Sequence, residues 1–142
     1  MLIRFVIIIG CCFSGAAALV VSCEKILTAS SDDLDEPRSC FMQEKTSISS
    51  ADYRIDTKDT RIAGLSFRSN KKIKFLPVQI SRAFPNLLVL SARICSISEV
   101  SKENFEGLKY LRFLYLDGNQ IVKILADTFE DLESLEKVGL GK

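Results

Sequence analysis

The sequence predicts an α/β solenoid, a fold in which similar units stack along one axis. Apolar residues recur with a period of 24, a cysteine or asparagine keeps a fixed place in the units, and a large apolar residue follows later in each unit. Such a period is typical of units that bury their apolar faces against their neighbours. The repeats cover residues 61–142, as about three units and a partial fourth.

The register of the repeat is clearest around the stretch LRFLYLDGNQI, residues 111–121. Its three leucines recur one period upstream and one period downstream as residues of similar type or size. The aligned sets are Leu87, Leu90 and Ala92; Leu111, Leu114 and Leu116; and Leu135, Val138 and Leu140. An earlier copy, at 62–73, carries one extra residue between Asn70 and Ile73. Loops absorb insertions more readily than strands do, so we expect a turn there.

These segments resemble the leucine-rich repeat family, whose strand segment reads L-x-x-L-x-L-x-x-N/C-x-L. LRFLYLDGNQI fits every place, with Ile at the last. LLVLSARICSI (87–97) has Ala92 in the sixth place and Cys95 in the N/C place, IAGLSFRSNKKI (62–73) has the inserted residue, and LESLEKVGLGK (132–142) begins a fourth unit. The resemblance implies short parallel strands on a concave face and loops or short helical turns on a convex face.

Strand geometry predicts where the side chains of each unit point. Successive side chains of a strand face opposite sides, so Leu114 and Leu116 point into the core while Tyr115 points outward. Asn119 follows in a turn, where its side chain is expected to bond to backbone groups. Cys95 takes the same place one unit earlier, so we interpret it as an inert core thiol.

Residues 1–22 are predicted to be a secretory signal peptide. They contain one basic residue, Arg4, followed by an apolar stretch and small residues, and no acidic residue occurs before Glu24. Cleavage is expected after Ala18 or after Ser22. The alternative is an uncleaved N-terminal anchor, because the apolar stretch is near the lower limit for spanning a bilayer. The protein is therefore expected to be secreted or, in the alternative, membrane-anchored.

Residues 23–60 lack the repeat and are predicted to form an N-terminal cap. A solenoid exposes the core of its first unit unless an atypical segment covers it. Cys23 and Cys40 lie in this segment, and an exported chain meets an oxidising compartment in which nearby cysteines usually pair. The sequence therefore predicts a Cys23–Cys40 disulfide, which leaves Cys95 as the odd cysteine.

The composition argues against catalysis, cofactors and nucleic-acid binding. The 142 residues include no histidine and no tryptophan, which removes histidine-based catalytic groups and histidine metal sites. The three cysteines outside the signal peptide lack zinc-ligand spacing. A formal net charge of +1 gives no strong basic field for a nucleic acid. We therefore expect no enzyme activity, cofactor, metal site or small-molecule substrate.

The candidate binding residues are outward side chains of the strand segments. The predicted set is Arg68, Arg93, Phe113, Tyr115 and Asp117. Stacking the units places both arginines beside Asp117, while the two rings form an aromatic spot. Aromatic residues next to arginine are the composition of protein-binding hot spots. The alternative is that the rings only shield neighbouring strands.

Together these features predict a secreted, non-catalytic module that binds a protein ligand on its concave face. The phrases FPNLLVL and ADTFEDLESL resemble secreted or cell-surface leucine-rich repeat proteins of arthropods, which implies a role in immune recognition or cell adhesion. The alternative is the N-terminal part of a longer cell-surface receptor or adhesion ectodomain. No closing cap follows the fourth strand segment, and such an open edge also suits self-association.

Overall fold

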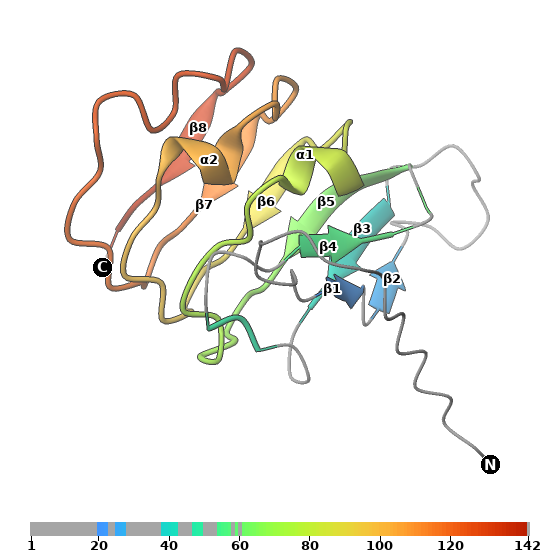
Figure 1. The fold of residues 1–142 in the computed structure, drawn as a ribbon, viewed down its shortest axis with the longest axis horizontal. Helices are drawn as coiled ribbons and strands as arrows, with labels where there is room; N and C mark the ends of the chain where they lie inside the picture. The colour runs from blue at the N-terminus through green and yellow to red at the C-terminus, as the bar shows by residue number, and fades with distance from the viewer. Residues whose placement is uncertain are drawn as a thin grey trace, which may run out of the picture.

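The computed structural model describes residues 20–22, 25–27, 38–42, 47–49, 54–57, 59 and 61–141. These residues form a solenoid of stacked turns (Figure 1), which confirms the predicted fold class. The strands are β1 (Val20–Ser22), β2 (Lys25–Leu27), β3 (Arg38–Phe41), β4 (Arg54–Asp56), β5 (Ile62–Ser66), β6 (Val89–Ser91), β7 (Phe113–Tyr115) and β8 (Lys137–Gly139). The helices are α1 (Ile80–Ala83) and α2 (Lys102–Phe105), so helix content is low.

Six strands form one sheet in the order β2-β3-β5-β6-β7-β8. Every neighbouring pair from β3 to β8 is parallel, whereas β2 runs antiparallel to β3. The register places Leu65, Leu90, Leu114 and Val138 side by side, one on each turn. The predicted parallel strands and repeat register are therefore confirmed. A separate two-stranded sheet pairs β1 with β4.

The extra residue of the first repeat lies in a turn, as predicted. The Asn70 N–H donates to the Phe67 carbonyl at 3.2 Å, and the Ile73 N–H donates to the Asn70 carbonyl at 3.1 Å. The Asn70 side chain accepts a further bond from the Lys72 N–H at 3.0 Å. The insertion is absorbed within this turn, so β5 keeps its register with β6.

The N-terminus of the short helix α2 is capped by polar residues that the equivalent turn of the next unit lacks. Its N-terminus carries a capping box, in which the Ser101 N–H donates to Asn104 Oδ1 at 2.8 Å. In the next unit Leu125 and Thr128 take these two places, and residues 126–131 form turns. Thr128 Oγ1 is buried and has no hydrogen-bond partner. The last unit, which lacks these capping residues, has a turn where the preceding one has a helix.

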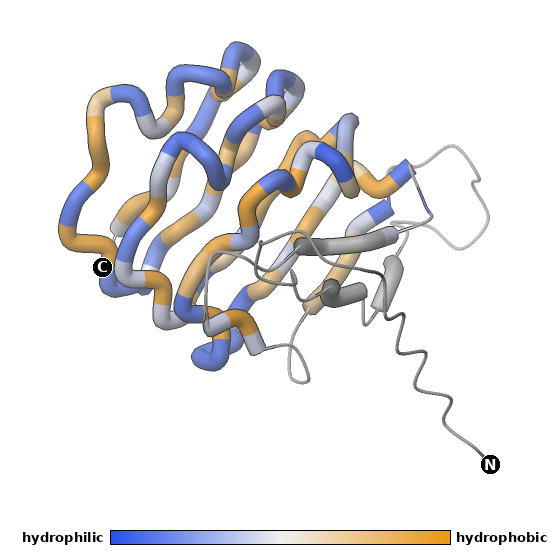
Figure 2. The backbone as a smooth tube through the Cα atoms, viewed as in Figure 1, coloured by the Kyte–Doolittle hydropathy of each residue, from blue (hydrophilic) through white to orange (hydrophobic). Residues whose placement is uncertain are grey.

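The core is built from the predicted repeat positions. Leu87, Leu90, Leu111 and Leu114 are fully buried, and hydrophobic and hydrophilic residues alternate along the turns (Figure 2). The last unit differs, because within the described chain β8 has a neighbour on one side only. Its apolar residues Val138 and Leu140 are 36% and 45% exposed.

The asparagine and cysteine of the repeat tie adjacent turns together. Asn119 Nδ2 donates at 2.7 Å both to the Leu116 carbonyl and, across the turns, to the Ala92 carbonyl. One unit earlier, Cys95 Sγ donates to the Phe67 carbonyl at 3.1 Å. Burial raises the pKa of the Cys95 thiol, which keeps it protonated and disfavours the nucleophilic thiolate.

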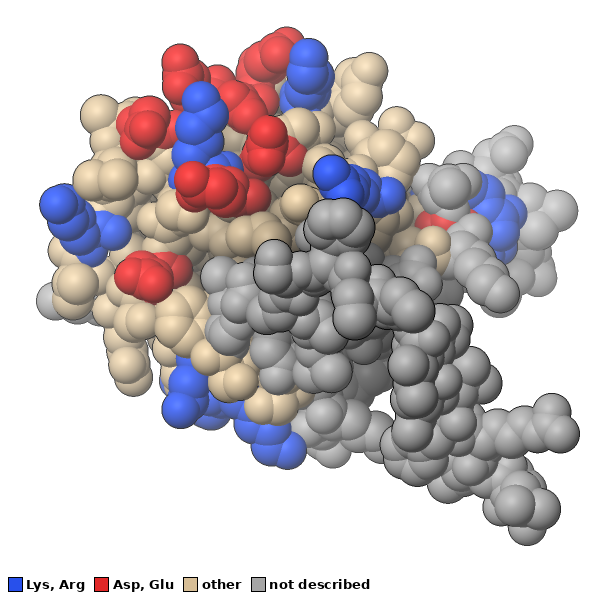
Figure 3. Space-filling model, viewed as in Figure 1, with Lys and Arg blue, Asp and Glu red and all other residues tan. Residues whose placement is uncertain are grey.

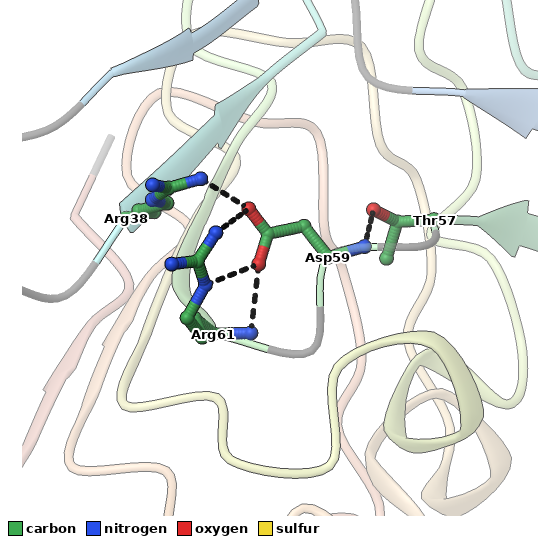
Figure 4. Close-up of polar contacts among 4 residues, drawn as sticks. All are labelled: Arg38, Thr57, Asp59 and Arg61. Atoms are coloured by element: carbon green, nitrogen blue, oxygen red, sulfur yellow. Dashed lines mark hydrogen bonds and ion pairs between the residues drawn. The ribbon is translucent and has the colours of Figure 1, made fainter. Parts of the chain in front are cut away.

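A charged cluster joins β3 to the first repeat (Figure 4). Asp59 Oδ2 lies 2.7 Å from Arg38 Nη1, and Asp59 Oδ1 lies 3.1 Å from Arg61 Nε. The Arg61 N–H also donates to Asp59 Oδ1 at 3.1 Å. These bonds, with the Arg61 side chain contributing most, outweigh burial and lower the pKa of Asp59 to about 2. The cluster therefore links the predicted cap to the repeats.

We expect the protein to lose stability as the pH falls from about 4 to about 2. The folded pKa of Asp59 is about 2, below the unfolded value of about 3.9. The stabilisation is therefore complete above the unfolded pKa and is lost as the pH falls through the folded one. Urea unfolding followed by circular dichroism at several pH values measures this loss. Asp59→Asn should be less stable at neutral pH and less sensitive to acid; an acid dependence identical to that of the wild type would contradict the cluster's role.

Part of the predicted N-terminal organisation lies outside the described residues. Cys23 and most of the predicted signal peptide 1–22 belong to that part. Cys40 is fully buried in β3 and is not a free thiol, but its pairing with Cys23 remains a prediction. Residues 20–22 form β1, so cleavage after Ala18 would keep this strand and cleavage after Ser22 would remove it. No helix among the described residues is long and apolar enough to cross a membrane.

Candidate interaction surface

The outward side chains of β5–β8 and of the residues that follow each strand form one surface, here called the strand face. The sheet register aligns its rows one turn apart. The first row is Gly64, Val89, Phe113 and Lys137; the second is Ser66, Ser91, Tyr115 and Gly139. A third row, Arg68, Arg93, Asp117 and Gly141, follows the strand ends. Both aromatic residues of these rows lie on β7, and the third row begins with two arginines.

Arg93, Tyr115 and Asp117 make a compact cluster on the strand face. Arg93 Nε donates to Asp117 Oδ2 at 3.0 Å, and the Arg93 guanidinium carbon lies 4.0 Å from the centroid of the Tyr115 ring. Asp117 also accepts a bond from the Gly141 N–H at 3.3 Å. A side chain at Gly139 would collide with the Asp117 carboxylate, so glycine there leaves room for the ion pair.

Opposing effects act on the charge of Asp117. Burial raises its pKa, but hydrogen bonds from the Arg93 side chain and from the backbone N–H groups of Asp117 and Gly141 outweigh burial. The net pKa lies below the ordinary value, so the residue is a carboxylate at neutral pH. The cluster therefore presents a fixed ion pair beside an aromatic ring.

The second ring of the strand face is also covered by a cation. The Arg112 guanidinium carbon lies 5.3 Å from the Phe113 ring centroid, while Arg112 Nε donates to Glu136 Oε1 at 2.6 Å. Lys137 Nζ lies 5.7 Å from the Tyr115 ring centroid. Tyr115 thus contacts cations of the two neighbouring turns. Both rings are only half-buried, so they remain accessible beside their cations.

The repeats of the C-terminal part match a family model. The model described as leucine rich repeat matches residues 85–142, which include β6, β7 and β8. The match supports a leucine-rich repeat family. Leucine-rich repeat domains are generally non-catalytic scaffolds that bind proteins. The upstream strand β5 lies outside the matched segment, yet it pairs with β6 in the register of the repeat.

The structure brings together most of the predicted binding residues. Arg93, Tyr115 and Asp117 are in contact, and Phe113 lies two residues from Tyr115 on the same face of β7. Arg68 lies one turn further from Asp117 than Arg93 does. The bond from the Ser69 N–H to the Arg93 carbonyl, at 2.8 Å, places Arg68 beside Arg93. The ion pair of Asp117 is therefore made by Arg93.

The sequence interpretation missed Arg112 and Glu136, although the repeat spacing contains the signal. These residues are 24 apart, as are Arg93 and Asp117. The same spacing joins Lys109 Nζ to Glu133 Oε1 at 3.5 Å. Near α2, Lys102 Nζ lies 2.8 Å from Glu130 Oε2. Figure 3 shows acidic and basic side chains next to one another on the face in view. Opposite charges one repeat apart therefore identify neighbours on adjacent turns.

One turn of the solenoid contains a strained residue, Ile94. Ser69, Ile94 and Gly118 hold equivalent places and all have positive φ, of 63°, 55° and 71°. Glycine adopts this conformation freely and serine is uncommon in it, whereas a β-branched residue is a true outlier. Ile94 is also 45% exposed, so burial offsets little of its strain. The sequence pattern gave no sign of this conformation, because isoleucine disfavours it.

Ile94→Asn is expected to raise the free energy of unfolding by about 0.5–1 kcal/mol. Asparagine tolerates the left-handed conformation, whose cost for other residues is about 1–2 kcal/mol, and part of the gain is lost with the isoleucine contacts. Urea unfolding measures the change. The reverse substitution, Gly118→Ile, should be destabilising, because its Cβ would lie 3.2 Å from Ile94 Cγ1 at a positive φ. A lower free energy of unfolding for Ile94→Asn than for the wild type would contradict backbone strain at Ile94.

Within the described part of the chain, no three His, Cys, Asp or Glu residues gather as a metal-binding group. Asp117 on the strand face and Glu136, directly before β8, each bind an arginine instead. Such pairs position side chains for contact with a partner and supply no free proton donor or acceptor. The strand face presents aromatic rings, guanidinium groups and hydrogen-bonding groups.

Proposed function

We propose that this protein is a secreted leucine-rich repeat module that binds a protein ligand on its strand face. The observation that carries the proposal is the position of Tyr115, in contact with Arg93 at 4.0 Å and with Lys137 at 5.7 Å while still half-exposed. Tyrosine and arginine are the residues most enriched at protein-binding hot spots. Roles in immune recognition or cell adhesion follow from the resemblance to arthropod proteins and belong to the same proposal.

Pre-organisation of the strand face supports the proposal. The Arg93–Asp117 and Arg112–Glu136 ion pairs hold two arginines against two aromatic rings. Side chains that are already ordered lose less conformational entropy on binding, which would otherwise cost about 0.5–1.5 kcal/mol for each one immobilised. The rival interpretation, that the rings only shield the strands, predicts no role for these residues in binding.

The double variant Arg93→Ala/Tyr115→Ala tests the proposal. The secreted wild-type protein is used to capture extracellular proteins by crosslinking, and the affinity of each captured protein is then measured with the variants. We expect the double variant to weaken binding at least tenfold, which corresponds to about 1.4 kcal/mol, without loss of secretion. The matched control is Arg82→Ala/Tyr110→Ala, which removes an exposed arginine and an exposed tyrosine outside the strand rows. Equal affinities of the double variant and the wild type would contradict the proposed site.

We also propose that the secreted chain carries a Cys23–Cys40 disulfide and is cleaved after Ala18. The pairing of β1 with β4 supports cleavage at Ala18, because this site leaves the strand in place. The burial of Cys40, which is not a free thiol, supports the disulfide. Intact mass under reducing and non-reducing conditions tests both points. A start after Ser22, an unchanged mass on reduction or an uncleaved, membrane-anchored chain would contradict them.

A second candidate function is that of the N-terminal part of a longer receptor or adhesion ectodomain. The observation that favours it is the exposure of Val138 and Leu140 beside a hollow of about 270 Å³, which Ile121, Ile124 and Leu140 help to line. A further repeat would cover this apolar surface. Self-association through β8 is the other way to cover it. An in-frame transcript with further units would support the receptor, and a concentration-dependent dimer would support self-association.

A further inference from the structure

We propose that the strand face recognises an acidic segment of a protein, with a carboxylate of that segment held between Arg68 and Arg93. This inference rests on the proposed function and specifies the chemistry of the partner. It follows from how the charges of the strand face are paired along the solenoid, one turn at a time.

Three arginines on or beside the strand face are not equally neutralised. Arg93 binds Asp117 and Arg112 binds Glu136, in each case one turn toward the C-terminus. The Ser69 N–H bonds to the Arg93 carbonyl at 2.8 Å. The residue one turn beyond Arg68 is therefore Arg93, which carries the same charge. Arg68 is exposed and makes no ion pair with any residue that the structure describes. An uncompensated positive charge therefore lies beside the Arg93–Asp117 pair.

Arg93 retains capacity to bind a second acceptor. Asp117 accepts from Nε of Arg93, and among the described residues no bond occupies the terminal nitrogens Nη1 and Nη2. A guanidinium group has five N–H donors in a planar fork that matches a carboxylate. A carboxylate placed between Arg68 and the Nη edge of Arg93 would receive charge-assisted bonds from both. It would also relieve the repulsion between the two adjacent arginines.

The surroundings favour a protein segment over a polyanion. Tyr115, which contacts Arg93, is a half-buried ring next to this position, and an apolar or aromatic side chain flanking the acid would pack on it. The carboxylates of Asp117 and Glu136, each paired with an arginine that contacts a ring, would repel a ligand with dense negative charge. Lys137, which contacts the Tyr115 ring, adds a further cation on the C-terminal side of that ring.

Paired peptide libraries test the inference with the full chain. Two immobilised libraries share one design of acidic and aromatic positions, except that one carries Glu wherever the other carries Gln. We expect the wild type to bind the Glu library at least tenfold more tightly, and Arg68→Gln to lose about tenfold of that affinity. Arg82→Gln, which changes an exposed arginine on α1, is the matched control and should bind as the wild type does. Added salt should weaken the binding to the Glu library.

The outcomes separate this inference from the proposed function. Equal binding to the Glu and Gln libraries, or equal effects of Arg68→Gln and Arg82→Gln, would overturn the acidic partner. If Arg93→Ala/Tyr115→Ala still weakened binding in that case, the strand face would remain the site. If neither the acidic preference nor the effect of Arg93→Ala/Tyr115→Ala were observed, the strand face would not be the binding site. Tighter binding of a sulfated polysaccharide than of the Glu library would replace the protein partner with a polyanion.

Discussion

Phe105→Ala is expected to lower the free energy of unfolding by about 3–5 kcal/mol, the largest effect of the substitutions considered. The Phe105 side chain is fully buried, and its ring centroid lies 5.4 Å from that of Phe129 on the next turn. Removal of the ring would leave a cavity between two repeats and break the aromatic pair. Urea unfolding monitored by circular dichroism measures the loss.

The repeat itself provides the control for this prediction. Phe129 stands one period after Phe105 and takes part in the same ring contact, but it is only partly buried. Phe129→Ala should therefore cost distinctly less, because a smaller apolar area returns to water. Equal losses for the two variants, or a larger loss for Phe129→Ala, would contradict the position of Phe105 at the centre of the stacked core.

Asn119→Ala is expected to cost about 2–3 kcal/mol, because it removes three hydrogen bonds of about 1 kcal/mol each. The Asn119 side chain donates to the Ala92 and Leu116 carbonyls at 2.7 Å and accepts from the Ile97 N–H at 3.1 Å. Alanine would leave these partly buried backbone groups unpaired. Urea unfolding, with hydrogen exchange of the Ile97 amide as a local reporter, measures the effect.

Two further variants separate the hydrogen bonds from general damage. Asn119→Asp keeps the size of the side chain and the acceptor for Ile97 but turns a charged oxygen toward two carbonyls, so it should be at least as destabilising as alanine. Asn86→Ala changes an exposed turn residue and should stay within about 0.5 kcal/mol of the wild type. A stable Asn119→Asp protein would contradict the assignment of the donors.

The register of the solenoid was predictable because the apolar core residues recur at the period of the repeat. Leu90 and Leu114 are one period apart in the sequence and lie opposite each other in the sheet. The bonding of Asn119 was predictable for a similar reason, since an asparagine after a strand serves the unpaired backbone of a turn. The contact of Arg93 with Asp117 followed once the register was known.

Other features depend on interactions that the repeat pattern does not encode. The stacking of Arg93 over Tyr115 depends on the side-chain conformations that both residues adopt. The parallel pairing of β3 with β5 joins a segment without repeats to the solenoid, and the Arg38–Asp59 ion pair spans 21 residues. Ile94 takes a backbone conformation that its own side chain disfavours, so stacking overrides local preference there.

Stacked 24-residue turns place Arg93, Tyr115 and Asp117 together on one face. Nuclear Overhauser contacts between methyl groups and rings of the labelled protein test this arrangement most directly. The register predicts cross-peaks between Leu90 and Leu114 and between Leu114 and Val138, with Val89 methyls close to the Phe113 ring. Neighbouring strands lie about 4.8 Å apart, so such contacts are strong. Assigned spectra without these cross-peaks, or with contacts shifted along the strands, would contradict the register and the binding surface built on it.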